Sequence, residues 1–188
     1  MDSNFKEIRT DRLVLKVLGG NYSQKVLEYF NRNKGFLMEW EPIRNDTFYT
    51  SDFQKIQLLK DLNSIKLGQM YKFWIFKKED NDCSRIIGSI AFNNIVRGCF
   101  QSCHLGYRLD KDEINKGYMT EGLRGALNFA FNELNLHRIE ANIMPKNKPS
   151  MCVVKKLGFS NEGVAKQYLF INGKWEDHIH MVLLNEKM

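Results

Sequence analysis

The chain has 188 residues, 43% of them hydrophobic, which suits one domain over residues 1–188 and excludes two. No apolar run reaches the roughly 18 residues of a membrane span, and the N-terminus lacks the order of a signal peptide, so we expect a cytoplasmic protein with no membrane partner. The formal net charge of +6 suits an anionic partner, but the basic residues are scattered, which disfavours a dedicated nucleic-acid site.

The N-terminal half predicts one strand, two helices and three further strands. Residues 21–30 have helical periodicity, with Asn21 as the expected cap and Gln24 as its capping-box partner. Residues 50–67 predict a second helix that ends at Gly68, with its apolar face at Phe53, Ile56, Leu59, Leu62 and Ile65. Alternating, aromatic or β-branched residues predict strands over 11–18, 70–78, 85–96 and 103–110.

A long amphipathic helix follows Gly117. We expect Gly122 and Gly125, which each cost up to about 1 kcal/mol relative to Ala in a helix, to permit close packing against the sheet. Its apolar positions are Met119, Leu123, Ala126, Leu127, Ala130, Phe131 and Leu134.

The rest of the chain predicts a strand, a short helix and a hairpin. Residues 137–144 alternate as a strand with one buried face. A helix begins near Pro149 and ends at Gly158. The pair Asn172-Gly173, between two aromatic and branched runs, is a strong signal for a hairpin turn.

The cysteines are too few and too unevenly spaced for a disulfide framework, so we expect free thiols at Cys83, Cys99, Cys103 and Cys152. The segment CFQSCH has no second pair of ligands at the spacing of a structural zinc site. We therefore expect no metal.

The sequence NKGYMT at 115–120 has two interpretations. Gly117 can simply allow a turn, because glycine adopts positive φ without steric cost. Alternatively, a glycine loop that opens a helix presents free backbone N–H groups and a partial positive charge, which together bind phosphate. The residues of the loop alone favour the turn, since short glycine motifs are weak evidence.

Four segments taken in order resemble the Gcn5-related N-acetyltransferase (GNAT) superfamily, and among its members the bacterial ribosomal-protein alanine N-acetyltransferases. The resemblance covers most of the C-terminal half, while the N-terminal half agrees in the order of its elements. It implies an α/β (α+β) fold with a central mixed, mostly antiparallel sheet flanked by helices. The segments are LGYRLD (105–110), NKGYMTEGL (115–123), LHRIEANIMPKNKPSMCVVKKLGF (136–159) and INGKWEDH (171–178).

By this resemblance the loop amides bind the pyrophosphate of acetyl-coenzyme A, the expected cosubstrate. The loop departs from the family pattern at Ile114, Asn115 and Met119, and the cofactor contact that Ile114 removes is expected either to be lost or to be supplied by Lys116. Asn147 would contact the pantetheine arm and Ser150 the thioester sulfur, although both residues also suit helix caps. The implied cofactor-binding residues are Tyr107, Arg108, Leu109, Asn115, Lys116, Gly117, Tyr118, Met119, Thr120, Asn147 and Ser150.

The expected chemistry is direct attack of a neutral amine on the thioester, for which a weak general base suffices. The candidate bases are Glu140 first and His104 second, although a glutamate on the polar face of a strand is more often solvated. Backbone N–H groups around Tyr107 to Leu109 would bind the acetyl carbonyl, and Ser150 would protonate the departing thiolate.

The expected acceptor is the N-terminal α-amine of a protein, for which a ribosomal protein is the leading candidate. The alternatives are a small amine (a polyamine, amino acid or aminoglycoside) and a module without turnover that senses coenzyme A or accompanies RNA. Tyr168, Phe170 and Trp175 of the hairpin are interpreted as packing residues, with an acceptor wall as the alternative, and Asp177 and His178 as structural. Monomer and homodimer both stay open.

Overall fold

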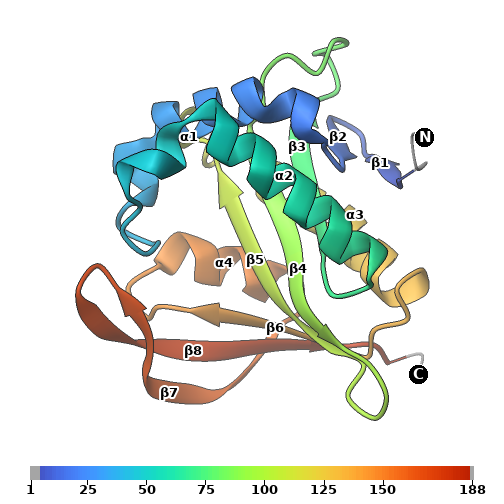
Figure 1. The fold of residues 1–188 in the computed structure, drawn as a ribbon. Coiled ribbons are helices and arrows are strands. Elements are labelled where there is room, and N and C mark those ends of the chain that lie inside the picture. The colour runs from blue at the N-terminus through green and yellow to red at the C-terminus, as the bar shows by residue number, and fades with distance from the viewer. Residues whose placement is uncertain (1–4, 187–188) are drawn as a thin grey trace.

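The protein is built on one eight-stranded sheet with strand order β1-β2-β3-β4-β5-β6-β8-β7 in the computed structural model, which describes residues 5–186 (Figure 1). Neighbouring strands are antiparallel except β5 and β6, which are parallel. This confirms the predicted mixed, mostly antiparallel sheet. The strands are β1 (Glu7–Arg9), β2 (Leu13–Lys16), β3 (Tyr71–Lys77), β4 (Gly88–Val96), β5 (Ser102–Leu109), β6 (Arg138–Ile143), β7 (Ser160–Ile171) and β8 (Lys174–Leu184).

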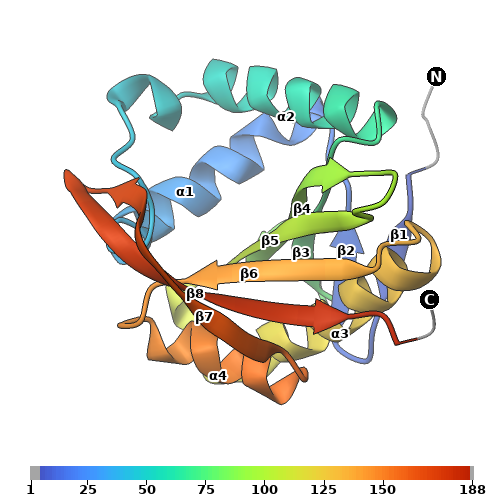
Figure 2. The same cartoon turned by 90° about the horizontal axis from the view of Figure 1, so that it is seen from below.

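Helices cover both faces of the sheet, α1 and α2 on one and α3 and α4 on the other (Figure 2). The alternation along β3 explains why: Phe73 packs in the core beneath α3, while its neighbour Trp74 packs in a second core beneath α1 and α2. The helices are α1 (Ser23–Leu37), α2 (Ser51–Lys66), α3 (Tyr118–Asn132) and α4 (Lys148–Lys156), with short 3-10 turns at Gly20–Tyr22, Asp46–Tyr49 and Lys111–Glu113.

The two glycines of α3 lie directly on the sheet, as predicted. A Cβ atom on Gly122 would lie 3.4 Å from the Ile90 side chain, and one on Gly125 would lie 3.2 Å from Ile8. The absence of side chains therefore lets α3 approach the strands at its N-terminal half, where the candidate phosphate loop begins.

The predicted capping box at the start of α1 is wrong. Asn21 lies inside the 3-10 turn, and α1 begins at Ser23 with no side-chain cap. Gln24 donates a hydrogen bond to Glu28 instead. Strand β1, with only three residues, was not predicted.

Helix α2 has the predicted ends but a different buried face. Thr50 caps its N-terminus, and Gly68 follows its end with φ 69°. Ile56 and Leu59 are about half exposed, at 54% and 51%, whereas Gln54 and Asp61 are buried. Both buried polar side chains have partners, Gln54 the Phe48 carbonyl and Asp61 the ammonium of Lys72, so helical periodicity of apolar residues pointed to the wrong face.

The hairpin between β7 and β8 turns at Asn172-Gly173, where φ is 50° and 80°, as its sequence predicts. Within residues 5–186, none of the helices has the length and apolar content needed to cross a membrane.

Candidate functional site

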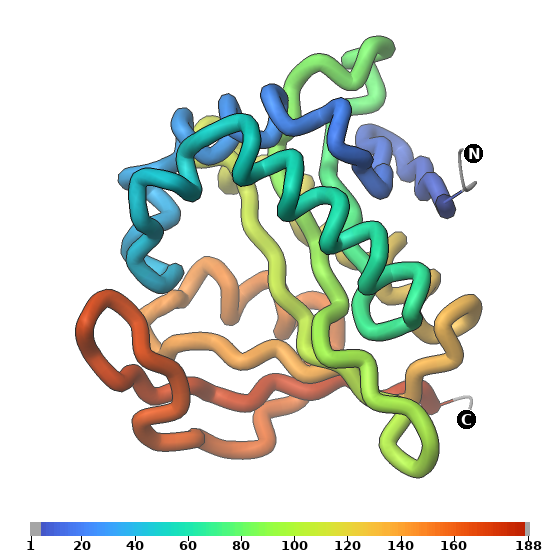
Figure 3. Tube along the Cα trace, viewed as in Figure 1, coloured from blue at the N-terminus to red at the C-terminus, as the bar shows by residue number. Residues whose placement is uncertain are grey.

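The site is centred on the place where β5 and β6 stop pairing. Their parallel register runs only from Ser102 beside Arg138 to His104 beside Glu140. Beyond that pair the two strands diverge, as the trace shows (Figure 3). We call the opening between residues 105–109 of β5 and 141–143 of β6 the wedge.

Two backbone amides of β5 face the wedge. The amide of Asp110 donates to the Ile87 carbonyl at 2.8 Å, which fixes the alternation of the antiparallel β4–β5 ladder. Arg108 therefore directs its N–H toward β4, while Tyr107 and Leu109 direct theirs toward β6. Since β6 has already diverged at this level, neither amide has a partner on β6 within residues 5–186, and both can donate to a carbonyl oxygen.

The side chain of Arg108, one of the predicted cofactor-binding residues, lies on the opposite face from α3 and α4. Its guanidinium pairs with Glu41 and lies 5.8 Å from the centre of the Phe30 ring. Neither the amide nor the side chain of Arg108 therefore reaches the wedge from the face of α3 and α4.

The loop before α3 has the backbone of an anion site. Asn115 and Gly117 have φ of 60° and 81°, and Gly117 caps α3 without any side-chain hydrogen bond. The amides of Tyr118, Met119 and Thr120 lie in the first helical turn, where N–H groups have no acceptor within the helix. This turn can therefore hold a phosphate by main-chain donation alone.

Arg12 fixes this loop from the side of β2. Its guanidinium donates to the Lys116 carbonyl at 3.1 Å, pairs with Glu121 at 2.7 Å and lies 4.6 Å from the centre of the Tyr118 ring. Burial alone would raise the pKa of Glu121, but hydrogen bonds from Thr10 and Arg12 hold it below its usual value. Sequence reasoning missed Arg12 and Glu121, because 109 positions separate them.

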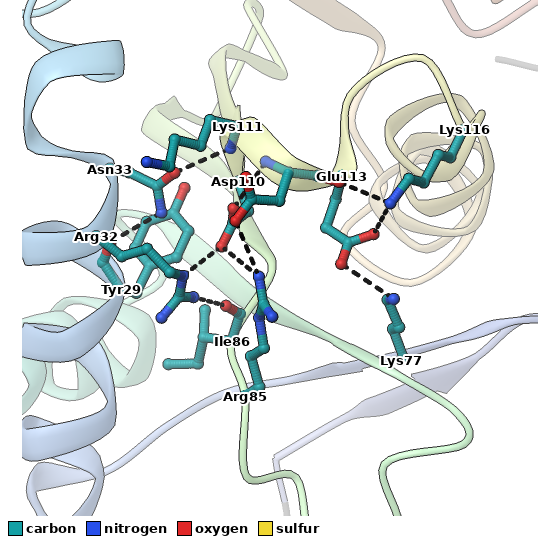
Figure 4. Close-up of polar contacts among 11 residues, drawn as sticks. Tyr29, Arg32, Asn33, Lys77, Arg85, Ile86, Asp110, Lys111, Glu113 and Lys116 are labelled. Atoms are coloured by element: carbon teal, nitrogen blue, oxygen red, sulfur yellow. Dashed lines mark hydrogen bonds and ion pairs between the residues drawn. The ribbon is translucent and has the colours of Figure 1, made fainter.

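Asp110 fixes the loop from below (Figure 4). Its side chain is fully buried and pairs with Arg32 of α1 at 2.7 Å, with Arg85 at 3.5 Å and with the Asp112 amide at 3.0 Å. Burial alone would raise the pKa of Asp110, yet these donors keep it below its usual value. A buried carboxylate thus connects α1 to the start of the loop.

Glu113 is the second buried carboxylate beneath the loop. It accepts the ammonium groups of Lys77 and Lys116, each at 3.0 Å, and these partners hold its pKa down against the effect of burial (Figure 4). Lys116 also donates to the Asp112 carbonyl. The Lys116 ammonium therefore points back to the start of the loop. If Lys116 supplies the contact that Ile114 removes, its ammonium must contact both Glu113 and a phosphate.

Helix α4 brings two predicted residues to the other end of the wedge. Asn147 caps α4 by accepting the Ser150 amide at 3.1 Å, which confirms its capping role. The hydroxyl of Ser150 lies 2.6 Å from the Tyr107 hydroxyl, which also contacts the Ser150 carbonyl at 3.0 Å. Burial raises the pKa of Tyr107 to about 12. Tyr107 thus stays protonated at neutral pH and connects β5 to α4 across the wedge.

The two predicted bases lie side by side at the last β5–β6 pair. Glu140 lies 3.9 Å from the His104 ring and 3.8 Å from the ring of His180 on β8, and it accepts a hydrogen bond from Arg138 at 2.7 Å. The structure therefore brings Glu140 and His104 together. It adds His180, which sequence reasoning missed because that residue lies 40 positions from Glu140.

A cavity of about 340 Å³ lies between α1, α2 and the sheet, on the opposite face from α3 and α4. Gly106 and Arg108 of β5 line it next to the wedge. Lys72 and Asp61 form an ion pair in its wall at 2.8 Å, and burial lowers the pKa of Lys72. The cavity therefore borders the β5 side of the wedge on this face.

The hairpin residues divide into buried and exposed groups. His178 is buried with its ring nitrogen 3.0 Å from the Glu176 carbonyl, and Asp177 accepts the Gln167 amide, which agrees with their structural interpretation. Phe170 and Trp175 are more than half exposed, so they are not core residues. They are opposite each other in the β7–β8 register and their rings are in contact, which confirms the alternative that they form a sheet pair.

The four cysteines are free thiols, and residues 5–186 contain no group of His, Cys, Asp or Glu side chains that could hold a metal ion.

Comparisons with known proteins agree with this architecture. Residues 8–160 match the Acetyltransferase (GNAT) domain family. The chain is 38% identical over 181 residues to the [Ribosomal protein uS5]-alanine N-acetyltransferase of Escherichia coli, covering 94% of this chain and 91% of that one. A crystal structure of the ribosomal-protein-S5-alanine acetyltransferase of Vibrio fischeri superposes with a TM-score of 0.91 at 34% identity, over 97% of this chain and 98% of that one. Mycobacterium smegmatis RimJ in complex with CoA-disulfide superposes at 0.87 with 23% identity, over 97% and 88%.

Proposed function

Because the chain belongs to the acetyltransferase (GNAT) domain family and is an N-acetyltransferase, we propose that it transfers acetyl from acetyl-coenzyme A to the N-terminal α-amine of a ribosomal protein. The main support for this proposal is the position of the wedge between two features of the molecule. It has an anion-binding loop on the face of α3 and α4 and a cavity on the face of α1 and α2. Cosubstrate and acceptor can therefore reach one point from opposite faces.

The cosubstrate is proposed to lie along the face of α3 and α4. Its pyrophosphate binds the amides at 117–120, its pantetheine arm passes Asn147, and its thioester enters the wedge near Ser150. Mycobacterium smegmatis RimJ, which shares the fold, forms a complex with CoA-disulfide, which supports a coenzyme A ligand for this fold. The acetyl oxygen then accepts hydrogen bonds from the wedge amides of Tyr107 and Leu109.

In the reaction, the amine lone pair forms the C–N bond, and the C–S bond breaks to release the coenzyme as a thiolate. An α-amine, with a pKa of about 7.7–8.0, is partly neutral near pH 7 and needs only a weak base. Glu140 and His104 stay the proposed bases. Ser150 stays the proposed acid for the departing sulfur. Its hydroxyl lies 2.6 Å from the Tyr107 hydroxyl, which donates to the Ser150 carbonyl and so fixes the position of Ser150 at the wedge.

The cavity and the E. coli relative both support a peptide acceptor. That relative acts on an alanine of ribosomal protein uS5. The cavity is lined by Arg44, Lys72 and Arg108 but by only one acidic residue, Asp61, which disfavours a polycationic small amine.

The test is a transfer assay with acetyl-coenzyme A against two panels, peptides with free N-termini and small amines, with products identified by mass. We expect acetylation of alanine-initiated peptides and none of peptides with a blocked N-terminus. Transfer to small amines alone would contradict the peptide acceptor. Binding of acetyl-coenzyme A without transfer to either panel would favour the non-catalytic alternative.

The matched variant is Ser150→Ala. If Ser150 is the acid, kcat falls at saturating acetyl-coenzyme A, whereas an unchanged kcat removes that role. Cys152→Ala, at an exposed position two residues further along α4, serves as the control.

A further inference from the structure

Two buried polar atoms near the wedge have no hydrogen-bond partner within residues 5–186. They are Oδ1 of Asn142 and Nε2 of His180. Buried polar atoms are nearly always paired, because an unpaired one costs about 1–3 kcal/mol. Two such atoms in one place therefore indicate a site for a donor.

The two side chains lie next to each other. Asn142 of β6 and His180 of β8 are directly opposite in the antiparallel register, so their Cβ atoms are about 5 Å apart and on the same face of the sheet. That face is the one away from α3 and α4, because the alternate residues Ile139, Ala141 and Ile143 pack in the core with α3.

The pair lies beside the wedge. Asn142 is the first residue on this face of β6 beyond Glu140, at which pairing with β5 ends. The wedge amides of Tyr107 and Leu109 are on the facing strand. An amine bound at Asn142 and His180 would therefore lie next to the proposed position of the thioester.

Both atoms are oriented as acceptors. The amide nitrogen of Asn142 donates to the Tyr168 hydroxyl at 3.3 Å, which turns Oδ1 away from β7. The Glu140 carboxylate lies 3.8 Å from Nδ1 of His180, so Nε2 is the ring nitrogen away from that carboxylate, and it is an acceptor in the tautomer that carries its proton on Nδ1. Tyr168 packs against the His180 ring at 5.0 Å and holds both residues in place.

We propose that Asn142 and His180 form an amine clamp that binds the two N–H bonds of a neutral primary amine. A primary amine has two N–H bonds and one lone pair. When Oδ1 and Nε2 accept the two hydrogens on one wall of the wedge, the lone pair points to the opposite wall, where the acetyl carbonyl lies. The clamp thus orients the nucleophile and selects primary over secondary amines. It rests on the proposed function.

The first experiment compares Asn142→Leu, which has a similar volume and lacks Oδ1, with Asn142→Asp, which keeps an acceptor oxygen. We expect kcat/KM for an alanine-initiated peptide to fall at least tenfold in Asn142→Leu and to be mostly retained in Asn142→Asp. Affinity for acetyl-coenzyme A, measured by calorimetry, should stay within twofold. Asn132→Leu, exposed at the end of α3, is the control.

The second experiment uses an N-methylalanine peptide, which has one N–H in its neutral form. The parent should prefer the alanine peptide, and Asn142→Leu and His180→Phe should both lose most of that preference. Equal kcat/KM in the parent and Asn142→Leu, or an unchanged preference in both variants, would overturn the clamp.

A binding measurement on the parent protein tests the clamp separately from the proposed function. It does not depend on whether any variant folds. With coenzyme A bound to the parent, addition of an alanine peptide should shift the NMR signal of the Asn142 side-chain amide. Peptide binding without that shift, or no peptide binding at all, overturns the clamp even where transfer occurs. Loss of all transfer while the shift is present counts against the proposed function alone.

Discussion

The two sides of the wedge are built differently. Within the segment 110–117 that leads into α3, both buried carboxylates have cationic partners, Asp110 with Arg32 and Glu113 with Lys77 and Lys116. Near β6 and β8, Asn142 and His180 each have a buried atom that lacks a hydrogen-bond partner within residues 5–186. The loop is thus preorganised by its own charges, whereas the acceptor side has hydrogen-bonding capacity for a substrate. Four changes test this difference.

Removal of the Asp110 charge should have the largest effect. In Asp110→Asn the buried partner of Arg32 is lost, and breaking such a pair costs about 3 kcal/mol or more. For a chain of this size we expect Tm to fall by about 6–12 °C, together with weaker binding of acetyl-coenzyme A.

Thermal unfolding and calorimetry measure the two effects. Asp112→Asn is the matched control, because that side chain is 57% exposed, and its Tm should change little. Equal Tm in the parent and Asp110→Asn would show that the pair does not hold the loop.

Acid should remove the stabilisation that the ionised Asp110 side chain gives to the folded state. The folded-state pKa of Asp110 is below its usual value, so its stabilisation is fully present above about pH 4 and is lost as pH falls through the lowered value. The difference in unfolding free energy between the parent and Asp110→Asn should therefore shrink from pH 6 to pH 3 in urea titrations. A difference that is constant over this range would contradict the assignment.

A Cβ atom at Gly117 should weaken cosubstrate binding. Gly117→Ala forces an L-residue to φ 81° and places its Cβ 3.4 Å from Arg12, and left-handed backbone costs roughly 1–2 kcal/mol. We expect a Kd for acetyl-coenzyme A about 5- to 30-fold higher.

The control is Gly98→Ala, at φ 71° with no atom near its Cβ, in the turn between β4 and β5. It should lose similar stability and keep its affinity for the cosubstrate. An equal loss of affinity in both variants would mean that the effect is one of folding rather than of the loop.

The smallest effect is expected at glycines inside helices. Gly35 of α1 has open space around its Cβ, so Gly35→Ala should stabilise the protein by about 0.5–1 kcal/mol and leave transfer unchanged. Gly125→Ala should gain less or lose stability, because its Cβ meets Ile8 at 3.2 Å. Chemical denaturation of both variants tests whether close packing of α3 requires Gly125, and equal gains would show that it does not.

Local signals explain how much of the fold was predicted. The strand periodicity of 70–78, the helix after Gly117 and the Asn172-Gly173 turn depend on neighbouring residues, and each is present where the sequence places it. The buried face of α2 was predicted wrongly because Gln54 and Asp61 are buried by partners from other segments.

The same distinction applies to the site. The sequence predicts the loop and Asn147 through local motifs, and it places Glu140 and His104 on two strands, which the structure shows to be adjacent. Their catalytic roles stay predictions. Arg12, Asp110 and His180 act through contacts with residues far away in the sequence, and no single-sequence pattern contains that information.

The order of strands has a consequence for folding. Strand β6 shares a short register with β5 and a longer one with β8, which ends at Leu184. The strand that carries Asn142 therefore keeps an unpaired edge until β8, the last strand of the sheet in chain order, is in place. The wall of the wedge that β6 forms is thus completed only by the last strand to be added.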